Sequence, residues 1–98
     1  MEIQYRLDVK IVESILKACA NEATILKLLY IARISYHSLK KYLFYLIEYD
    51  CITYQGEERV YKIGYEGWKL LSEIKTVKKI MMVIEVNNEH DITIVFES

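Results

Sequence analysis

The residues with the clearest chemical potential in this 98-residue chain are cations and hydroxyl groups that gather between positions 33 and 41. Lysine and arginine neutralise phosphate charge, and serine and tyrosine hydroxyls hydrogen-bond to phosphate oxygens. A second basic group follows the turn at Gly56. The pattern predicts contact with a nucleic acid, and the candidate DNA-binding residues are Arg33, Ser35, Tyr36, His37, Ser38, Lys40, Lys41, Arg59 and Lys62.

Catalytic chemistry has no comparable support in the sequence. The chain contains no glycine-rich phosphate loop and no nucleophile motif, so we expect no enzyme activity. The carboxylates of Glu57 and Glu58, and those of Glu89 and Asp91, fall in predicted polar turns. Such positions are typical of solvated residues rather than of an acid–base pair.

The cysteines and histidines do not predict a metal site. Cys19 and Cys51 are far apart and form no CxxC pair, and a lone histidine such as His37 is not a metal site. We expect no metal, no cofactor and no small-molecule ligand. Cys19 falls on an apolar helix face and Cys51 opens an apolar strand. This favours two buried free thiols, with a disulfide as the alternative.

The elements that must position the basic residues are three successive helices. Hydrophobic residues recur at helical spacing over residues 9–20, after an N-cap at Asp8. A short helix over residues 25–32 follows Thr24, and Ser35 caps a third helix that runs to about Tyr49. A short helix joined to a longer one by a tight turn is the helix-turn-helix signature. A single helix of this kind fits the DNA major groove.

A β-hairpin and a fourth helix complete the predicted domain. Alternating residues predict strands over 51–55 and 59–63, with a turn between them. A further helix is expected from Tyr65 to about Val77. The predicted fold class is therefore α+β: a winged helix-turn-helix domain over residues 1–77, with a three-helix core, a hairpin wing and a fourth helix. Residues 1–7 alternate and predict a short strand.

The last segment, residues 78–98, changes its period and predicts a C-terminal β-hairpin over residues 79–97. The alternative is that the fourth helix continues past Lys79. A lone hairpin is only marginally stable, so we expect it to form a dimer contact, or else to extend a sheet within the chain. The candidate interface residues are Ile80, Met82, Ile84, Ile92, Ile94 and Phe96.

Several of these segments carry a family resemblance over residues 9–75. They are Y-I-A-R-I-S-Y at 30–36, L-K-K-Y-L at 39–43, L-I-E at 46–48, C-I-T-Y at 51–54 and I-G-Y-E-G at 63–67, with Leu70 and Leu71 after them. The run resembles the small archaeal winged-helix DNA-binding proteins and predicted transcriptional regulators. The resemblance implies a winged helix that binds double-stranded DNA. It also suggests an archaeal or archaeal-virus source.

The chain departs from these relatives in a few places. Gly64 replaces their usual threonine before the last helix, and Ile31 and Phe44 stand where they usually carry polar residues. Some relatives end in a long dimerising coiled coil, whereas the tail here alternates like a strand.

The composition of the chain bears on its binding partners, its cellular location and its source. Thirteen basic and 14 acidic residues give a net charge of −1, which argues mildly against DNA binding. No apolar run is long enough to span a membrane and the N-terminus does not look like a signal peptide, so we expect a cytoplasmic protein. Absent proline, scarce glycine and abundant Ile, Tyr, Lys and Glu fit a hyperthermophile or an AT-rich genome.

Three functions follow from these observations. The first is a homodimeric transcriptional regulator that reads double-stranded DNA through its third helix. The second is a winged-helix protein–protein interaction module without DNA binding, which the acidic turn at Glu57 and Glu58 and the exposed aromatic Phe44 favour. The third, a general DNA-coating protein, is the least supported because coating depends on excess positive charge.

Overall fold

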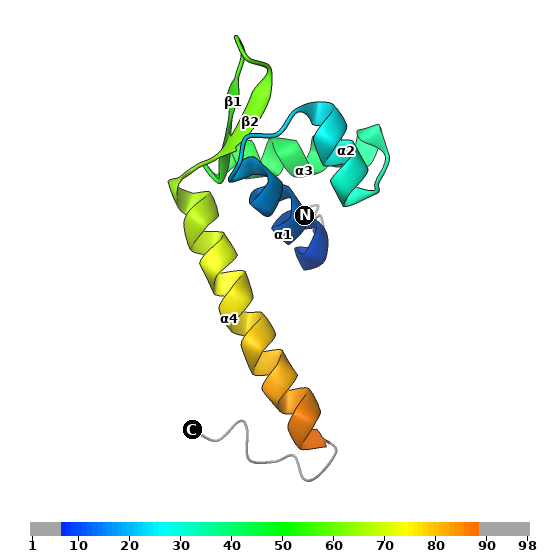
Figure 1. Ribbon diagram of the computed structural model, residues 1–98, viewed down its shortest axis with the longest axis vertical. Coiled ribbons are helices and arrows are strands. Elements are labelled where there is room, and N and C mark those ends of the chain that lie inside the picture. Colours follow the sequence, from blue (N-terminus) through cyan, green and yellow to red (C-terminus); the bar gives the residue numbers. More distant parts are fainter. Residues whose placement is uncertain (1–6, 89–98) are drawn as a thin grey trace, which may run out of the picture.

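The computed structural model describes residues 7–88, and side chains over residues 7–81. It is a winged helix-turn-helix domain from which the last helix extends well beyond the other elements (Figure 1). The predicted fold class is confirmed. The elements in chain order are α1 (Val9–Cys19), α2 (Ile25–Ala32), α3 (Tyr36–Glu48), β1 (Ile52–Gln55), β2 (Val60–Ile63) and α4 (Tyr65–Asn88).

The first three helices begin at the predicted capping residues. Asp8 accepts a hydrogen bond from the Lys10 amide at 2.7 Å, and Thr24 accepts one from the Lys27 amide at 3.2 Å. Ser35 does the same for the Ser38 amide at 3.0 Å. Each cap satisfies an amide that the helix itself leaves without a partner. These short side chains therefore define where α1, α2 and α3 start.

The core forms where α1, α2, α3 and β1 meet. Its fully buried side chains come from all four elements: Ile15, Leu16, Cys19, Leu28, Leu39 and Ile52. Cys19 and Cys51 are both buried free thiols, as predicted. Burial raises the pKa of the Cys19 thiol to about 12, so this group packs as a small apolar side chain.

The wing is a two-stranded antiparallel hairpin attached to the helices. Ile52 pairs with Ile63, and Gln55 pairs with Val60. Ala23, in the loop between α1 and α2, exchanges two backbone hydrogen bonds with Tyr61, of 3.0 and 2.7 Å. This bridge joins the wing to the helix-turn-helix, so the position of the wing relative to α3 is set by backbone contacts.

A glycine allows α4 to pack against the start of the wing. A Cβ atom built on Gly67 would lie 2.1 Å from the backbone oxygen of Cys51, so no larger residue fits there without a shift. The Gly64 amide donates to the same oxygen at 2.8 Å. Leu71 and Ile74 follow on α4 and are buried in the core. The first half of α4 is therefore part of the domain.

The predicted C-terminal hairpin is wrong over residues 79–88, because α4 continues without a break from Tyr65 to Asn88. The apolar run around Ile80 fits a period of two, but it also fits a helical period, and periodicity alone cannot separate the two. No glycine or proline follows Gly67 to end the helix. Ile92, Ile94 and Phe96, residues 1–6 of the strand predicted at 1–7, and the remainder of the hairpin lie outside the described residues.

No helix in the described part of the chain combines the length and the apolar character that crossing a membrane requires.

Candidate nucleic-acid interface

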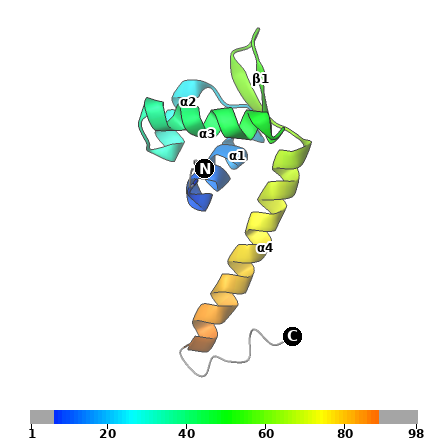
Figure 2. The ribbon, with the colours of Figure 1, turned by 180° about the vertical axis from the view of Figure 1, so that it is seen from behind.

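The outward face of α3 carries the largest group of candidate residues. Leu39, Tyr42, Leu43 and Leu46 point into the core, which leaves the opposite side of the helix in solvent. Figure 2 shows α3 on the near side of the domain, with the wing beside its C-terminal end. An open hollow of about 310 Å³ lies on this face, and its lining residues are His37, Lys40, Lys41, Phe44 and Tyr45.

The turn before α3 holds the helix in place and adds one cation. Arg33 has a left-handed backbone conformation, with φ of 57°, and its amide donates to the Leu29 carbonyl at 3.0 Å. This geometry ends α2 and allows α3 to begin three residues later. The exposed Arg33 side chain stands at the N-terminal end of α3.

The N-terminus of α3 combines hydroxyl groups with a cation–π contact. The hydroxyls of Ser35 and Ser38 lie 3.1 Å apart and hydrogen-bond to each other. The Lys40 ammonium lies 5.4 Å from the centre of the Tyr36 ring, a favourable cation–π distance. The ring is exposed, so this contact supports the lysine without covering it.

The wing carries less uncompensated positive charge than its sequence suggests. The Lys62 ammonium lies 3.3 Å from a carboxylate oxygen of Glu22 and 3.9 Å from one of Glu58. Arg59 is exposed, in a left-handed conformation with φ of 56°. The wing, which carries Arg59 and Lys62, lies beside the C-terminal end of α3. Arg33 and Ser35 precede the other end of this helix.

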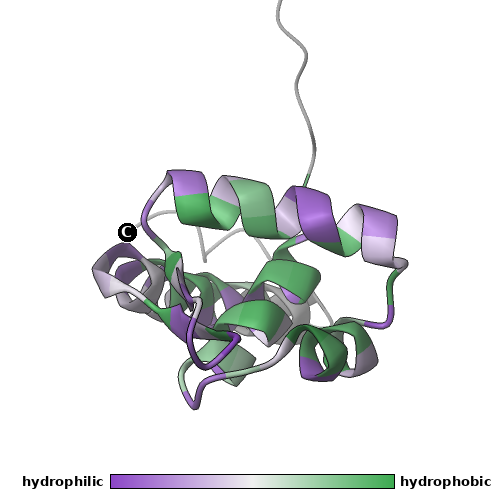
Figure 3. Ribbon diagram, turned by 90° about the horizontal axis from the view of Figure 1, so that it is seen from above, coloured by the Kyte–Doolittle hydropathy of each residue, from purple (hydrophilic) through white to green (hydrophobic). Residues whose placement is uncertain are grey.

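Seen from above, α3 runs along one edge of the domain, and hydrophilic and hydrophobic segments alternate along its ribbon (Figure 3). The alternation reflects the amphipathic sequence, in which Lys40 and Lys41 separate the buried Leu39 from the buried Tyr42 and Leu43. The exposed cations are therefore carried by a helix whose opposite face is fixed in the core.

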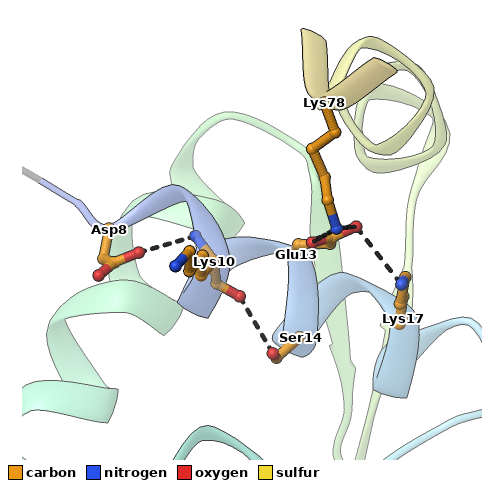
Figure 4. Close-up of polar contacts among 6 residues, drawn as sticks. All are labelled: Asp8, Lys10, Glu13, Ser14, Lys17 and Lys78. Carbon is orange, nitrogen blue, oxygen red and sulfur yellow. Dashed lines mark hydrogen bonds and ion pairs between the residues drawn. The ribbon is translucent and has the colours of Figure 1, made fainter. Parts of the chain in front are cut away.

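An ion cluster around the buried carboxylate of Glu13, between α1 and α4, was not among the features expected from the sequence. Lys78 donates to both carboxylate oxygens of Glu13, at 3.0 and 3.2 Å, and Lys17 lies 3.4 Å from one of them (Figure 4). The hydrogen bond from Lys78 lowers the pKa of the Glu13 carboxyl although burial opposes this. The cluster fixes α4 against α1, and hence the direction in which α4 leaves the domain.

The part of the chain that the structure describes contains no candidate metal site. Over those residues, no three side chains of the types His, Cys, Asp and Glu come together in a way that could hold an ion.

The sequence profile of the winged helix-turn-helix family matches residues 5–82, and the chain belongs to this family. Among solved structures, it is similar to Sso10a-2, a DNA-binding protein from Sulfolobus solfataricus, with 27% sequence identity and a TM-score of 0.72. The likeness covers 86% of this chain and 90% of that chain. No curated protein matches the chain.

Proposed function

We propose that this chain binds double-stranded DNA by placing α3 in the major groove, and that it acts as a homodimeric transcriptional regulator without catalysis. The observation that carries the proposal is the outward face of α3, where His37, Lys40 and Lys41 line one exposed surface of a rigid helix. The similar structure is that of a DNA-binding protein, which supports the same assignment. Its Sulfolobus source also supports the archaeal origin suggested by the resemblance.

Residues on either side of α3 would hold the helix on the DNA backbone. Arg33 and the hydroxyl of Tyr36 suit phosphates at the N-terminal end of α3, and Ser35 and Ser38 lie at the same helix end. Arg59 suits the backbone beside the wing. Such contacts, and those of Lys40 and Lys41, fix the register and carry no sequence information by themselves, so base readout falls to other side chains on the exposed face of α3.

The dimer would form through the second half of α4 instead of a hairpin. Val77 and Met81 are 55% and 51% exposed, and Ile80 is 49% exposed. Val77 and Met81 are spaced four residues apart, and in the sequence Ile84 follows Met81 after three more. An apolar repeat of this kind is typical of helices that pair along a seam. Pairing would present two α3 helices to half-sites about one DNA turn apart.

The experiment that tests the proposal is fluorescence-anisotropy titration of the full chain with a random duplex DNA pool across a salt series. Phosphate contacts predict affinity that falls linearly with the logarithm of salt concentration. Sequencing of the bound fraction should reveal a roughly palindromic motif if a dimer reads two half-sites. Salt-sensitive binding without enrichment would instead indicate a DNA-coating protein.

A protein–protein interaction module is the second candidate. The exposed carboxylates of Glu57 and Glu58 at the wing tip favour it, because they would repel phosphate. The net charge of −1 favours it as well. Absence of binding in the anisotropy titration, even at low salt, would make this the leading function.

A further inference from the structure

The most exposed large hydrophobic side chain of α3 is that of Phe44, ahead of Tyr36 and Ile47. Phe44 is 60% exposed, although the helix buries its other large apolar residues from Leu39 to Leu46. Phe44 and Tyr45 pack edge to face, with ring centres 5.2 Å apart and planes at 82°. This contact restricts the phenyl ring, which therefore presents a fixed apolar surface to solvent.

The surroundings of Phe44 indicate what could cover that surface. The ring shares its hollow with the side chains of Lys40, Lys41 and His37. An apolar wall between cationic side chains is poorly matched to an apolar protein patch, because the lysines would lose their hydration. It is well matched to DNA, where the phosphates are anionic and the thymine C5-methyl is an apolar group on the base edges of the major groove.

We propose that Phe44 is a specificity-determining residue that packs against a thymine 5-methyl group in the major groove. The inference rests on the proposed DNA binding by α3 and names one base that it reads. Phe44 follows His37 by two helical turns, about 10 Å along the helix axis. For an α3 that runs along the groove, this separation places the preferred thymine about three base pairs from the base pair that faces the N-terminal end of α3.

The test compares two duplex pools that differ only in this methyl group. One pool is prepared with thymidine and the other with deoxyuridine, which keeps the pairing and removes the methyl. Wild-type protein should bind the uracil pool more weakly, by about fourfold for each buried methyl contact that is lost. Single deoxyuridine substitutions in an enriched duplex should then place the loss at one position in each half-site.

Two variants assign the effect to Phe44. In Phe44→Ala the difference between the thymine and uracil pools should disappear, and Phe44→Gln, which keeps a long side chain without an aromatic surface, should behave alike. Both changes fall on an exposed position, so the fold should be retained, which circular dichroism checks. The matched control is Lys40→Ala with Lys41→Ala, which should weaken binding to both pools equally and leave their ratio unchanged.

The outcomes separate this inference from the proposed function. Wild-type binding that is equal for the two pools would overturn the role of Phe44 and leave DNA binding intact. A uracil penalty that persists in Phe44→Ala and Phe44→Gln would also overturn it, because another residue would then read the methyl. Absence of binding to either pool would overturn the proposed function, and the role of Phe44 with it.

Discussion

Two lysine–glutamate clusters in this molecule have opposite composition, and their central side chains differ in exposure. At the junction of α1 and α4, the single carboxylate of Glu13 lies between Lys17 and Lys78, and its side chain is only 9% exposed. At the wing, the single ammonium of Lys62 lies between Glu22 and Glu58, and its side chain is 38% exposed. The outer partners of both clusters are more than half exposed.

The difference in exposure gives the two clusters different roles. Breaking a buried charge pair leaves an uncompensated charge in a low-dielectric environment and is costly, whereas an exposed pair contributes about 0–1 kcal/mol. The Glu13 cluster is therefore a fixed part of the domain that orients α4. In the proposed DNA complex, a phosphate can therefore replace either carboxylate of the exposed Lys62 cluster.

The largest effect is expected at Gly67, where α4 is anchored against the start of the wing. Alanine is favoured over glycine in most helices by about 1 kcal/mol. Here the added Cβ would meet the Cys51 oxygen, so Gly67→Ala should lower the free energy of unfolding by about 3 kcal/mol. Denaturant unfolding measures this.

The matched control for Gly67 is Gly56→Ala at the wing tip. The nearest atom to a Cβ there belongs to the Tyr54 ring, at 4.0 Å, so this change should leave stability nearly unchanged. Equal stability of the Gly67→Ala protein and the wild type would show that α4 is not held by close backbone packing.

The next largest effect is expected for Glu13→Gln. This change removes the buried negative charge, so that Lys17 and Lys78 lose the carboxylate with which they both form ion pairs. Because Lys78 is 58% exposed and can return to water, the loss should be about 2 kcal/mol, below the range for fully buried pairs. The control is Glu73→Gln, an exposed residue of α4, the helix that carries Lys78. If both variants unfold at the same denaturant concentration, the cluster does not stabilise the domain.

The same carboxylate predicts a dependence of stability on pH. The hydrogen bond from Lys78 lowers the pKa of Glu13 in the folded protein below its ordinary value of 4.5. Its contribution is therefore fully present above that value and is lost as the pH falls through the lower, folded pKa. The stability difference between wild type and Glu13→Gln should stay constant down to about pH 5 and shrink below it. A difference that grows on acidification would contradict this assignment.

Local signals in the sequence were sufficient to predict most of the domain. Capping residues such as Thr24 and Ser35 act within three residues of their position, and a hairpin needs only two alternating runs and a turn. The end of α4 could not be predicted in this way, because the residues around Ile80 satisfy both the helical and the strand period.

Contacts between distant segments were also beyond the sequence. Glu13 and Lys78 are separated by 65 positions, and their pairing depends on how α4 packs on α1. The same is true of Lys62 and Glu22, which meet only because Ala23 bridges to Tyr61 on the wing. The candidate residues of α3, by contrast, share a face by helical spacing alone.

The contrast between α3 and the wing is tested by replacing Lys40 and Lys41 together with alanine. Loss of two phosphate contacts should weaken DNA binding about tenfold and reduce the slope of log affinity against log salt by about two. Lys75→Ala with Lys79→Ala, on the exposed surface of α4, removes the same charge away from α3 and should have little effect. Equal losses in the two double variants would mean that net charge, and not the α3 surface, controls binding.

The smallest effect is expected for Glu58→Gln, which removes one of the carboxylates that hold Lys62. Freed in part from its ion pairs, Lys62 can reach a phosphate more readily, so DNA affinity should rise about threefold, in line with the strength of an exposed pair. Removal of any acidic charge near DNA also reduces repulsion, and Glu57→Gln at the same wing tip measures that contribution alone. A larger gain for Glu58→Gln, which disappears when Lys62→Ala is added, would identify the wing lysine as an exchangeable DNA contact. Equal gains for Glu57→Gln and Glu58→Gln would show that the Lys62 ion pairs do not compete with DNA.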